Sequence, residues 1–155
     1  MLPRVLPRSR VGGILRRRCF SDTAAAVCDV FHLGAIPYRE AWDLQKRMQK
    51  HRIDNQDAAD GALLLEHPPV YTLGRGASEE FVKFDPECPS NNFELFRVER
   101  GGEVTYHAPG QLVLYPLLNL KRHQRNLHWF LRQCEEVVIR TLQEYDIPSE
   151  RDPEY

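Results

Sequence analysis

The spacing of hydrophobic positions changes several times along the chain, and each spacing predicts an element. Residues 27–33 alternate between two faces, which predicts a strand that ends at Gly34. Pro37 suits the first turn of a helix that runs to about His51, with apolar side chains at three- and four-residue steps. This stripe, which we expect in the core, consists of Tyr38, Ala41, Trp42, Leu44 and Met48. The pattern therefore predicts a strand followed by an amphipathic helix.

Short apolar or alternating runs separated by glycine and proline fill the middle of the chain. The predicted strands are 62–66, 70–73, 93–98 and 111–119, and the predicted loops are 54–61 and 82–92. His67-Pro68-Pro69 separates the predicted strand 62–66 from the predicted strand 70–73. Pro116 indicates an edge or a bulge in the last strand. Strands and helices therefore mix along the chain, as in an α/β domain.

A second amphipathic helix is predicted after a basic turn at 121–125, with Asn126 as its N-cap. Its apolar positions recur at three- and four-residue steps, which predicts a buried stripe. The positions are Leu127, Phe130, Leu131, Cys134, Val137, Val138, Thr141, Leu142 and Tyr145. Because Cys134 falls on this stripe, we expect a small core residue there and not a nucleophile.

One glycine-rich segment lies between the predicted strands 93–98 and 111–119. It reads Arg100-Gly101-Gly102-Glu103-Val104-Thr105-Tyr106-His107-Ala108-Pro109-Gly110-Gln111. Glycine pairs permit positive φ, and the residue before a proline is pushed towards extended geometry, so the segment predicts turn, short strand, turn. Such loops between strands often bind ligands, although many only reverse the chain.

A second glycine-rich turn, Gly74-Arg75-Gly76, follows the predicted strand 70–73. The strands that carry the two turns are close in sequence, so we expect both turns to border one pocket. Glycine backbone N–H groups could approach a carbonyl or oxyanion there, with hydrogen bonds from Thr105, Tyr106 and His107. Neither turn has the spacing of a dinucleotide fingerprint or a P-loop, so nucleotide binding is a weak alternative.

Charge is distributed unevenly over the 155 residues, although the net charge is only −1. Six arginines precede the first acid, Asp22, and without them 15 basic residues face 22 acidic ones. The acidic remainder argues against nucleic acid as a partner, and no apolar run approaches the ~20 residues of a membrane span.

The arginine-rich, acid-free start, with Arg18-Cys19-Phe20-Ser21, is similar to a mitochondrial transit peptide and its cleavage pattern. We therefore expect residues 1–26 to be a transit peptide and linker that deliver the protein to the mitochondrial matrix. A basic tail that binds anionic surfaces nonspecifically is the alternative.

The four cysteines are widely scattered, with no Cys-x-x-Cys pair, so neither a zinc site nor a disulfide framework is indicated. They are Cys19, Cys28, Cys88 and Cys134. We expect no metal and no cofactor.

Two motifs carry a resemblance to a known family. They are Glu66-His67-Pro68-Pro69-Val70-Tyr71-Thr72-Leu73-Gly74-Arg75 and the segment Arg100 to His107 with Pro109-Gly110-Gln111. In this order they resemble the lipoyl(octanoyl) transferase family, and with the transit-like start the chain looks like the mitochondrial member. The resemblance implies that residues 27–155 form the N-terminal part of an α/β (α+β) catalytic domain. Its mixed β-sheet, flanked by helices, would be similar to that of biotin protein ligases and lipoate ligases.

The resemblance implies transfer of an octanoyl group from octanoyl-acyl carrier protein to a lysine of a lipoyl domain. The acceptors would be glycine cleavage H protein and the acyltransferase subunits of 2-oxoacid dehydrogenases. Arg75 and the segment Arg100, Gly101, Gly102, Glu103, Val104, Thr105, Tyr106 and His107 would bind the substrate. Ala108 stands where the family usually has glycine, which should be tolerated unless φ there is positive.

In this family the nucleophilic cysteine and a lysine that lowers its pKa lie on strands after the long helix, beyond Tyr155 here. We expect no catalytic residue in these 155 residues and little activity from the chain alone. We expect Cys88 to be exposed and only a weak substitute, and we expect His67 and His107 to orient backbone or substrate. The alternatives are a noncatalytic fragment that contacts carrier protein or lipoyl domains, and an ATP-using ligase.

Overall fold

The computed structural model describes the backbone of residues 9–11, 14–20, 27–85 and 93–152, with side chains from residue 27 onward. The chain divides into two compact units, Met1–Leu118 and Asn119–Tyr155. Neither of the described α-helices is long and apolar enough to cross a membrane.

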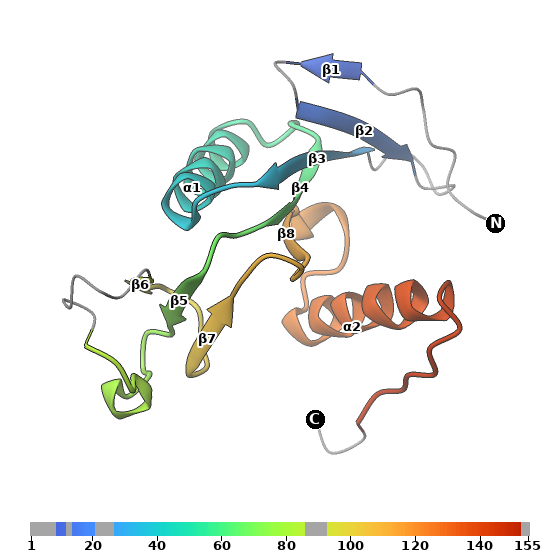
Figure 1. Ribbon diagram of the computed structural model, residues 1–155. Helices are drawn as coiled ribbons and strands as arrows, with labels where there is room; N and C mark the ends of the chain where they lie inside the picture. The colour runs from blue at the N-terminus through green and yellow to red at the C-terminus, as the bar shows by residue number, and fades with distance from the viewer. Residues whose placement is uncertain (1–8, 12–13, 21–26, 86–92, 153–155) are drawn as a thin grey trace. The chain divides into compact units, whose positions relative to one another are not determined.

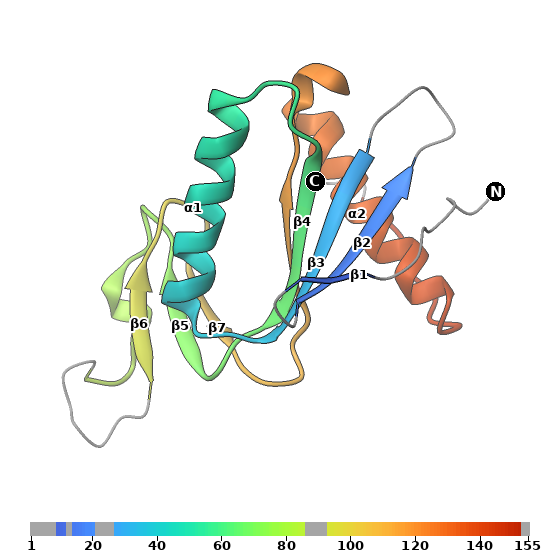
Figure 2. The ribbon, with the colours of Figure 1, turned by 90° about the horizontal axis from the view of Figure 1, so that it is seen from above.

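The first unit contains a five-stranded mixed sheet in the order β1-β2-β3-β4-β8 (Figure 1). Its strands are β1 (Ser9–Val11), β2 (Ile14–Phe20), β3 (Val27–Ala35), β4 (Asp60–Glu66) and β8 (Val113–Leu117). Only β3 and β4 run parallel, and the helix α1 (Tyr38–Asp54) connects them (Figure 2). Parallel neighbours need such a crossover, whereas antiparallel ones can be joined by tight turns. In the described sheet β8 is an edge strand, which accommodates Pro116 as predicted.

A three-stranded sheet follows in the order β6-β5-β7. Its strands are β5 (Val70–Leu73), β6 (Glu94–Arg97) and β7 (Val104–His107), and the 3-10 helix η1 (Glu79–Phe81) lies between β5 and β6. His67-Pro68-Pro69 leads the chain out of β4 and into β5, so the predicted interruption separates two sheets. β5 lies between a parallel β6 and an antiparallel β7, so the β6–β7 connection must cross the end of β5.

Helix α1 supplies the core of both sheets with different parts of one stripe. Tyr38, with Trp42 beside it, packs against Val70, Phe96 and Val98 of the smaller sheet and its turn. Ala41 is fully buried against Leu63 and Leu65 of β4, and Leu44 and Met48 extend that contact. The predicted core stripe is confirmed, and it joins the two sheets.

The second unit contains the 3-10 helix η2 (Leu120–Arg122) and the helix α2 (Leu127–Gln143). Asn126 is the predicted N-cap: its side-chain oxygen accepts a hydrogen bond from Trp129 N at 3.0 Å. At the other end Asp146 has φ of 56° and Ile147 N donates to Leu142 O, as in a Schellman cap. Arg151 then pairs with Glu135 and Glu136 of the helix. These local contacts define the two ends of α2.

The prediction that the apolar stripe of α2 is buried is wrong. No residue of α2 is buried, and Leu127 and Val138 are 65% and 56% exposed. An amphipathic pattern shows that a helix has an apolar face, but it does not show which element covers that face. Cys134 is half-buried and is therefore not the core residue that the stripe predicted. Burial raises the pKa of its thiol, which disfavours the nucleophilic thiolate.

Several predicted boundaries also shift. β4 begins at Asp60, inside the predicted loop 54–61, and β8 is shorter than the predicted strand 111–119. Gly34 does not end β3, because the strand continues to Ala35 through a bulge in which Gly34 adopts φ of 67°. The first helix continues past His51 to Asp54, since no proline or glycine stops it before Gly61. The α/β class is confirmed, with two small mixed sheets in place of the single expected one.

Residues 14–20 lie within the predicted transit peptide and linker, residues 1–26, and form β2 here. β2 pairs with β3 from Leu15↔His32 to Phe20↔Val27. The boundary at residue 26 stays a prediction.

Candidate functional site

The two glycine-rich turns meet in space, as expected. The connection from β6 to β7 crosses the end of β5, where Arg75 N donates to Arg100 O at 2.9 Å and Val98 N donates to Leu73 O at 2.8 Å. A Cβ on Gly74 would overlap the carbonyl oxygen of Gly102, so only glycine allows this crossing. Gly102 itself has φ of 79°. The glycines bring the two backbones into direct contact.

We call the face of the smaller sheet that α1 packs against the covered face. The guanidinium group of Arg100 points into this covered face. Its Nη2 donates to Thr72 O, Thr72 Oγ1 and Thr105 Oγ1 at 2.8, 2.8 and 2.9 Å, and its Nη1 donates to Gly101 O at 2.9 Å. The planar guanidinium group donates several hydrogen bonds in fixed directions, which the ammonium group of a lysine cannot reproduce. Arg100 therefore joins β5, β7 and the crossing turn.

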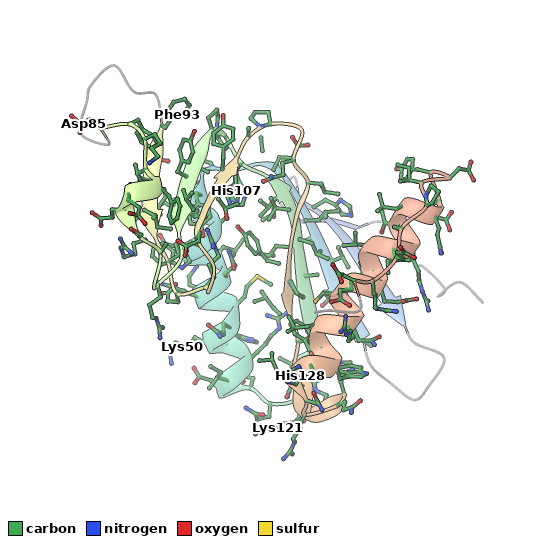
Figure 3. The ribbon with its side chains drawn as sticks, turned by 90° about the horizontal axis from the view of Figure 1, so that it is seen from below. Lys50, Asp85, Phe93, His107, Lys121 and His128 are labelled. Atoms are coloured by element: carbon green, nitrogen blue, oxygen red, sulfur yellow. The ribbon has the colours of Figure 1, made fainter. Side chains whose placement is uncertain are left out.

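His107, at the end of β7 (Figure 3), lies beside this group. Its Nε2 is 3.5 Å from Thr72 Oγ1, and its Nδ1 is 2.6 Å from Gln111 Oε1. Gln111 Nε2 lies 3.4 Å from Tyr106 O. The turn after β7 is held by Gly110 N, which donates to Glu66 Oε2 at 2.7 Å. His107 thus contacts both a neighbouring strand and the turn that follows its own strand.

A cluster of three rings lies next to His107: His67 and Tyr38 are buried, and Tyr115 is half-buried. His67 has no exposed surface; its Nδ1 is 2.8 Å from Ile36 O and its Nε2 is 2.9 Å from Tyr115 Oη. A carbonyl only accepts, so Nδ1 carries the proton and Tyr115 donates to Nε2. The ring centroid of Tyr38 is 5.0 Å from that of His67 and 6.2 Å from that of His107. His67 therefore links the ends of β3 and β4 to β8.

Burial keeps this cluster neutral. It lowers the pKa of His67, an effect that the charge of a nearby His107 increases and the Ile36 hydrogen bond opposes. Burial also raises the pKa of Tyr38 and Tyr115 above the usual phenol value. At neutral pH the cluster therefore offers neutral phenols and a neutral imidazole.

Glu99, one residue before Arg100, fixes the crossing turn to α1. Trp42 Nε1 donates to Glu99 Oε2 at 3.2 Å, and Lys46 Nζ lies 3.2 Å from Glu99 Oε1. The Glu99 backbone N–H and Lys46 lower the pKa of this carboxyl group. Lys46 also lies 3.7 Å from the Trp42 ring centroid. These contacts attach the turn to the helix that covers the site.

The predicted substrate-binding residues fall into three groups. Thr105 and His107 share the covered face with the Arg100 side chain, whereas Val104 and Tyr106 project to the opposite face, because side chains alternate along β7. Gly101, Gly102 and Glu103 form the exposed turn. Arg75 is exposed, and no side-chain partner is found for it among the described residues. Ala108 has no positive φ, so alanine is tolerated there.

Sequence reasoning did not select four of the residues that build this arrangement. Thr72 and Gln111 stand inside the two motifs, but nothing local distinguished them from their neighbours. Tyr38 and Tyr115 appeared only as an apolar helix position and a strand position. The hydrogen-bond partners come from distant parts of the chain, so only the fold identifies these four.

The described thiols are remote from this site or weakly reactive. Cys28 pairs with Asp60 at the start of β4, about 20 Å along the strand from Glu66, which precedes His67. Cys88 lies outside the described residues. Among the residues that the structure describes, no group of three His, Cys, Asp or Glu side chains could hold a metal ion.

The fold and the site together define a class of protein. The structure is a mixed α/β domain in which α1 packs against both sheets. A glycine-rich turn and the strand that follows it place Arg100 and His107 on the smaller sheet. The family described as "Lipoyl protein ligase A/B catalytic domain" matches residues 37–155, which is more than half of the chain. The chain belongs to this family.

Relatives of the chain carry the name octanoyltransferase. The chain is 55% identical to one from Nostoc sp. over 126 residues, which are 81% of this chain and 56% of the relative. It is 52% identical to one from Synechocystis sp., covering 80% of this chain and 54% of that one. A chloroplastic octanoyltransferase of Arabidopsis thaliana is 50% identical, covering 74% and 42%. The chain thus spans about half the length of these relatives.

Proposed function

We propose that this chain forms the acyl-binding part of an octanoyltransferase, which moves an octanoyl group from octanoyl-acyl carrier protein to a lysine of a lipoyl domain. Family membership and relatives that carry this activity in their names support the proposal. The same names favour a transferase over an ATP-using ligase. Acceptors would be glycine cleavage H protein and the acyltransferase subunits of 2-oxoacid dehydrogenases.

The observation that carries the proposal is the crossing of two glycine turns beside a neutral, largely buried ring cluster. Exposed glycine backbone near Arg75 suits the polar thioester end of a substrate. The half-buried ring of His107, which lies beside the ring of Tyr38, suits its apolar part. We therefore centre the substrate site on the turn 100–103, Thr105 and His107.

Burial of the acyl chain sets the expected size of the effect. At about 0.8 kcal/mol per CH₂, complete burial of an octanoyl chain contributes on the order of 5 kcal/mol. Even partial burial should make the octanoyl form bind at least about tenfold more tightly than the unacylated form, which equals about 1.4 kcal/mol.

Titrating the 155-residue chain with labelled carrier protein tests this proposal. We expect saturable, salt-sensitive binding that is tighter for octanoyl-carrier protein than for the same protein without its acyl group. The unacylated carrier protein is the matched control for contacts outside the acyl site. Equal affinity for the two forms would contradict an acyl-binding role.

A noncatalytic role, contacting carrier protein or lipoyl domains, is a second candidate. Thioester exchange needs a thiolate at the site, and the two thiols whose side chains the structure describes do not offer one: the pKa of Cys134 is raised and Cys28 lies on β3, far from Glu66. Intact-mass measurement of a lipoyl domain, after incubation with the chain and octanoyl-carrier protein, separates the candidates. An octanoylated acceptor supports the transferase, and binding without modification supports the second role. A requirement for ATP would favour a ligase.

We also propose that residues 1–26 direct the protein to the mitochondrial matrix. The support is the arginine-rich, acid-free composition of the first twenty residues. The relatives named above are cyanobacterial or chloroplastic and give this proposal no support. Microscopy of a fluorescent fusion to residues 1–26 tests it, and chloroplast or cytosolic fluorescence would contradict it.

A further inference from the structure

Five groups, one of which is the His107 ring, form one continuous series of hydrogen bonds. Arg100 Nη2 lies 2.8 Å from Thr72 Oγ1, which lies 3.5 Å from His107 Nε2. His107 Nδ1 lies 2.6 Å from Gln111 Oε1, and Gln111 Nε2 lies 3.4 Å from Tyr106 O. The series connects a permanent cation to a backbone carbonyl.

Both ends of this series have a fixed polarity. A guanidinium can only donate, and a backbone carbonyl can only accept. The Tyr106 carbonyl therefore requires the nitrogen of the Gln111 amide, which leaves the amide oxygen facing His107 Nδ1. Because that oxygen only accepts, Nδ1 must carry the ring proton.

The same reasoning holds from the Arg100 side. Thr72 Oγ1 accepts a hydrogen bond from Arg100, so its own proton is free to point at His107 Nε2. In the neutral ring Nε2 is then the acceptor. At 3.5 Å this bond is at the limit of hydrogen bonding, so Nε2 can exchange Thr72 for a better donor.

We propose that Gln111 is a positioning residue that fixes His107 as its Nδ1–H tautomer, so that His107 meets substrate as a hydrogen-bond acceptor through Nε2. In this form Nε2 cannot donate to a thioester carbonyl. It can accept from an N–H of an incoming amine. The identity of that amine, the acceptor lysine, rests on the proposed function, but the tautomer of His107 does not.

Long-range ¹H–¹⁵N spectra of the imidazole rings test the proposal directly. They distinguish a protonated ring nitrogen from an unprotonated one, and they require neither activity nor a bound substrate. Measurement at about pH 8.5 keeps an ordinary imidazole, with a pKa of about 6.5, neutral. A His107→Asn variant assigns the His107 signals among the six histidines.

We expect wild-type His107 to show Nδ1–H with unprotonated Nε2. Gln111→Leu removes the acceptor and should give a mixture of tautomers, while Gln111→Glu keeps an oxygen acceptor and should keep Nδ1–H. His67, whose Nδ1 faces Ile36 O, is the internal control and should be unchanged in both variants.

An Nε2–H tautomer in the wild type would overturn the proposal, as would an unchanged spectrum in Gln111→Leu. If Gln111→Leu does not fold, Gln111→Glu decides, because loss of Nδ1–H in that variant also overturns it. If the expected tautomer is present but the chain does not bind octanoyl-carrier protein, the result counts against the proposed function alone.

Discussion

The two faces of the small β6-β5-β7 sheet are built from alternate residues of the same strands, yet they differ in chemistry. On the face that α1 covers, Arg100 donates to the hydroxyl oxygens of Thr72 and Thr105, and Thr72 Oγ1 lies 3.5 Å from His107 Nε2. On the opposite face, Tyr71 and Tyr106 stack with ring centroids 4.8 Å apart. Phe84 and Phe93 pack against the same Tyr71 ring.

The difference follows from how much water each face retains. Thr72 has no exposed surface, and a buried polar group must find partners or lose free energy, so the covered face forms a connected network. On the opposite face Tyr106 is 43% exposed, and a partly exposed aromatic pair can use water in place of a polar partner in the protein. The covered face therefore combines polar side chains with a fixed geometry, which a binding site requires.

The largest effect should come from Gly74→Ala. The added Cβ would force apart the turns that hold the covered face together, so we expect a loss of about 3 kcal/mol in the free energy of unfolding. Urea unfolding followed by tryptophan fluorescence measures it. Gly76→Ala is the matched control, because no atom lies within 4 Å of its Cβ position. Equal stability of the two variants would contradict the crossing geometry.

Arg100→Ala should be the next most damaging change, at about 2–3 kcal/mol, because it leaves Thr72 and Thr105 acceptors without their donor. Arg100→Lys should recover only part of this loss, since it lacks the planar fork. Urea unfolding is again the measurement. Arg75→Ala, at an exposed arginine one turn away, should change stability by less than about 0.5 kcal/mol. If Arg75→Ala lowers the free energy of unfolding more than Arg100→Ala does, the structural role assigned to Arg100 is wrong.

Tyr115→Phe should lower the free energy of unfolding by about 1–2 kcal/mol, because it leaves the buried Nε2 of His67 without a donor.

His67 should also make stability depend on pH. Its pKa is lowered in the folded chain, so between about pH 6.5 and that lower value the unfolded chain binds more protons. The free energy of unfolding should therefore fall as the pH decreases through this window.

Unfolding midpoints at several pH values measure this effect, with His67→Gln as the comparison. The variant should show a shallower loss of stability below about pH 6.5. An equally steep loss in both proteins would show that His67 is not the group responsible.

The smallest effects should distinguish the two faces within a single strand. Thr105→Val keeps the shape of the side chain but removes the oxygen that Arg100 contacts, so it should cost about 1 kcal/mol. Tyr106→Phe keeps the ring that packs on Tyr71 and should stay within about 0.5 kcal/mol of the wild type. Urea unfolding compares them. If Tyr106→Phe is the more damaging variant, the assignment of the faces is wrong.

Local features of the fold were predictable from the sequence. The break at His67-Pro68-Pro69, the turn–strand–turn of residues 100–111 and the Asn126 cap all depend on neighbouring residues, and all are confirmed. The α1 stripe is confirmed because its helical period is strong. The α2 stripe shows the limit of the same signal, since periodicity identifies an apolar face but not its partner.

The site was only partly predictable. The sequence indicated that the turns around Arg75 and Arg100 would meet, but it did not show that the β6–β7 connection crosses β5. It treated Arg100 and Arg75 alike as substrate-binding residues. In the structure Arg100 forms internal hydrogen bonds, while Arg75 remains exposed. These roles depend on contacts between residues about 30 positions apart.

By itself, the sequence determined the family motifs, the order of the strands and α-helices from residue 27 onward, and the alternation of side chains along β7. A strand period of two places Thr105 and Tyr106 on opposite faces whatever the fold. Only the tertiary structure decided which face α1 covers, and therefore which side chains must find partners in place of water. That choice joins Thr72 to Arg100 and His107, because Thr72 is fully buried and an unpaired donor or acceptor there would be costly.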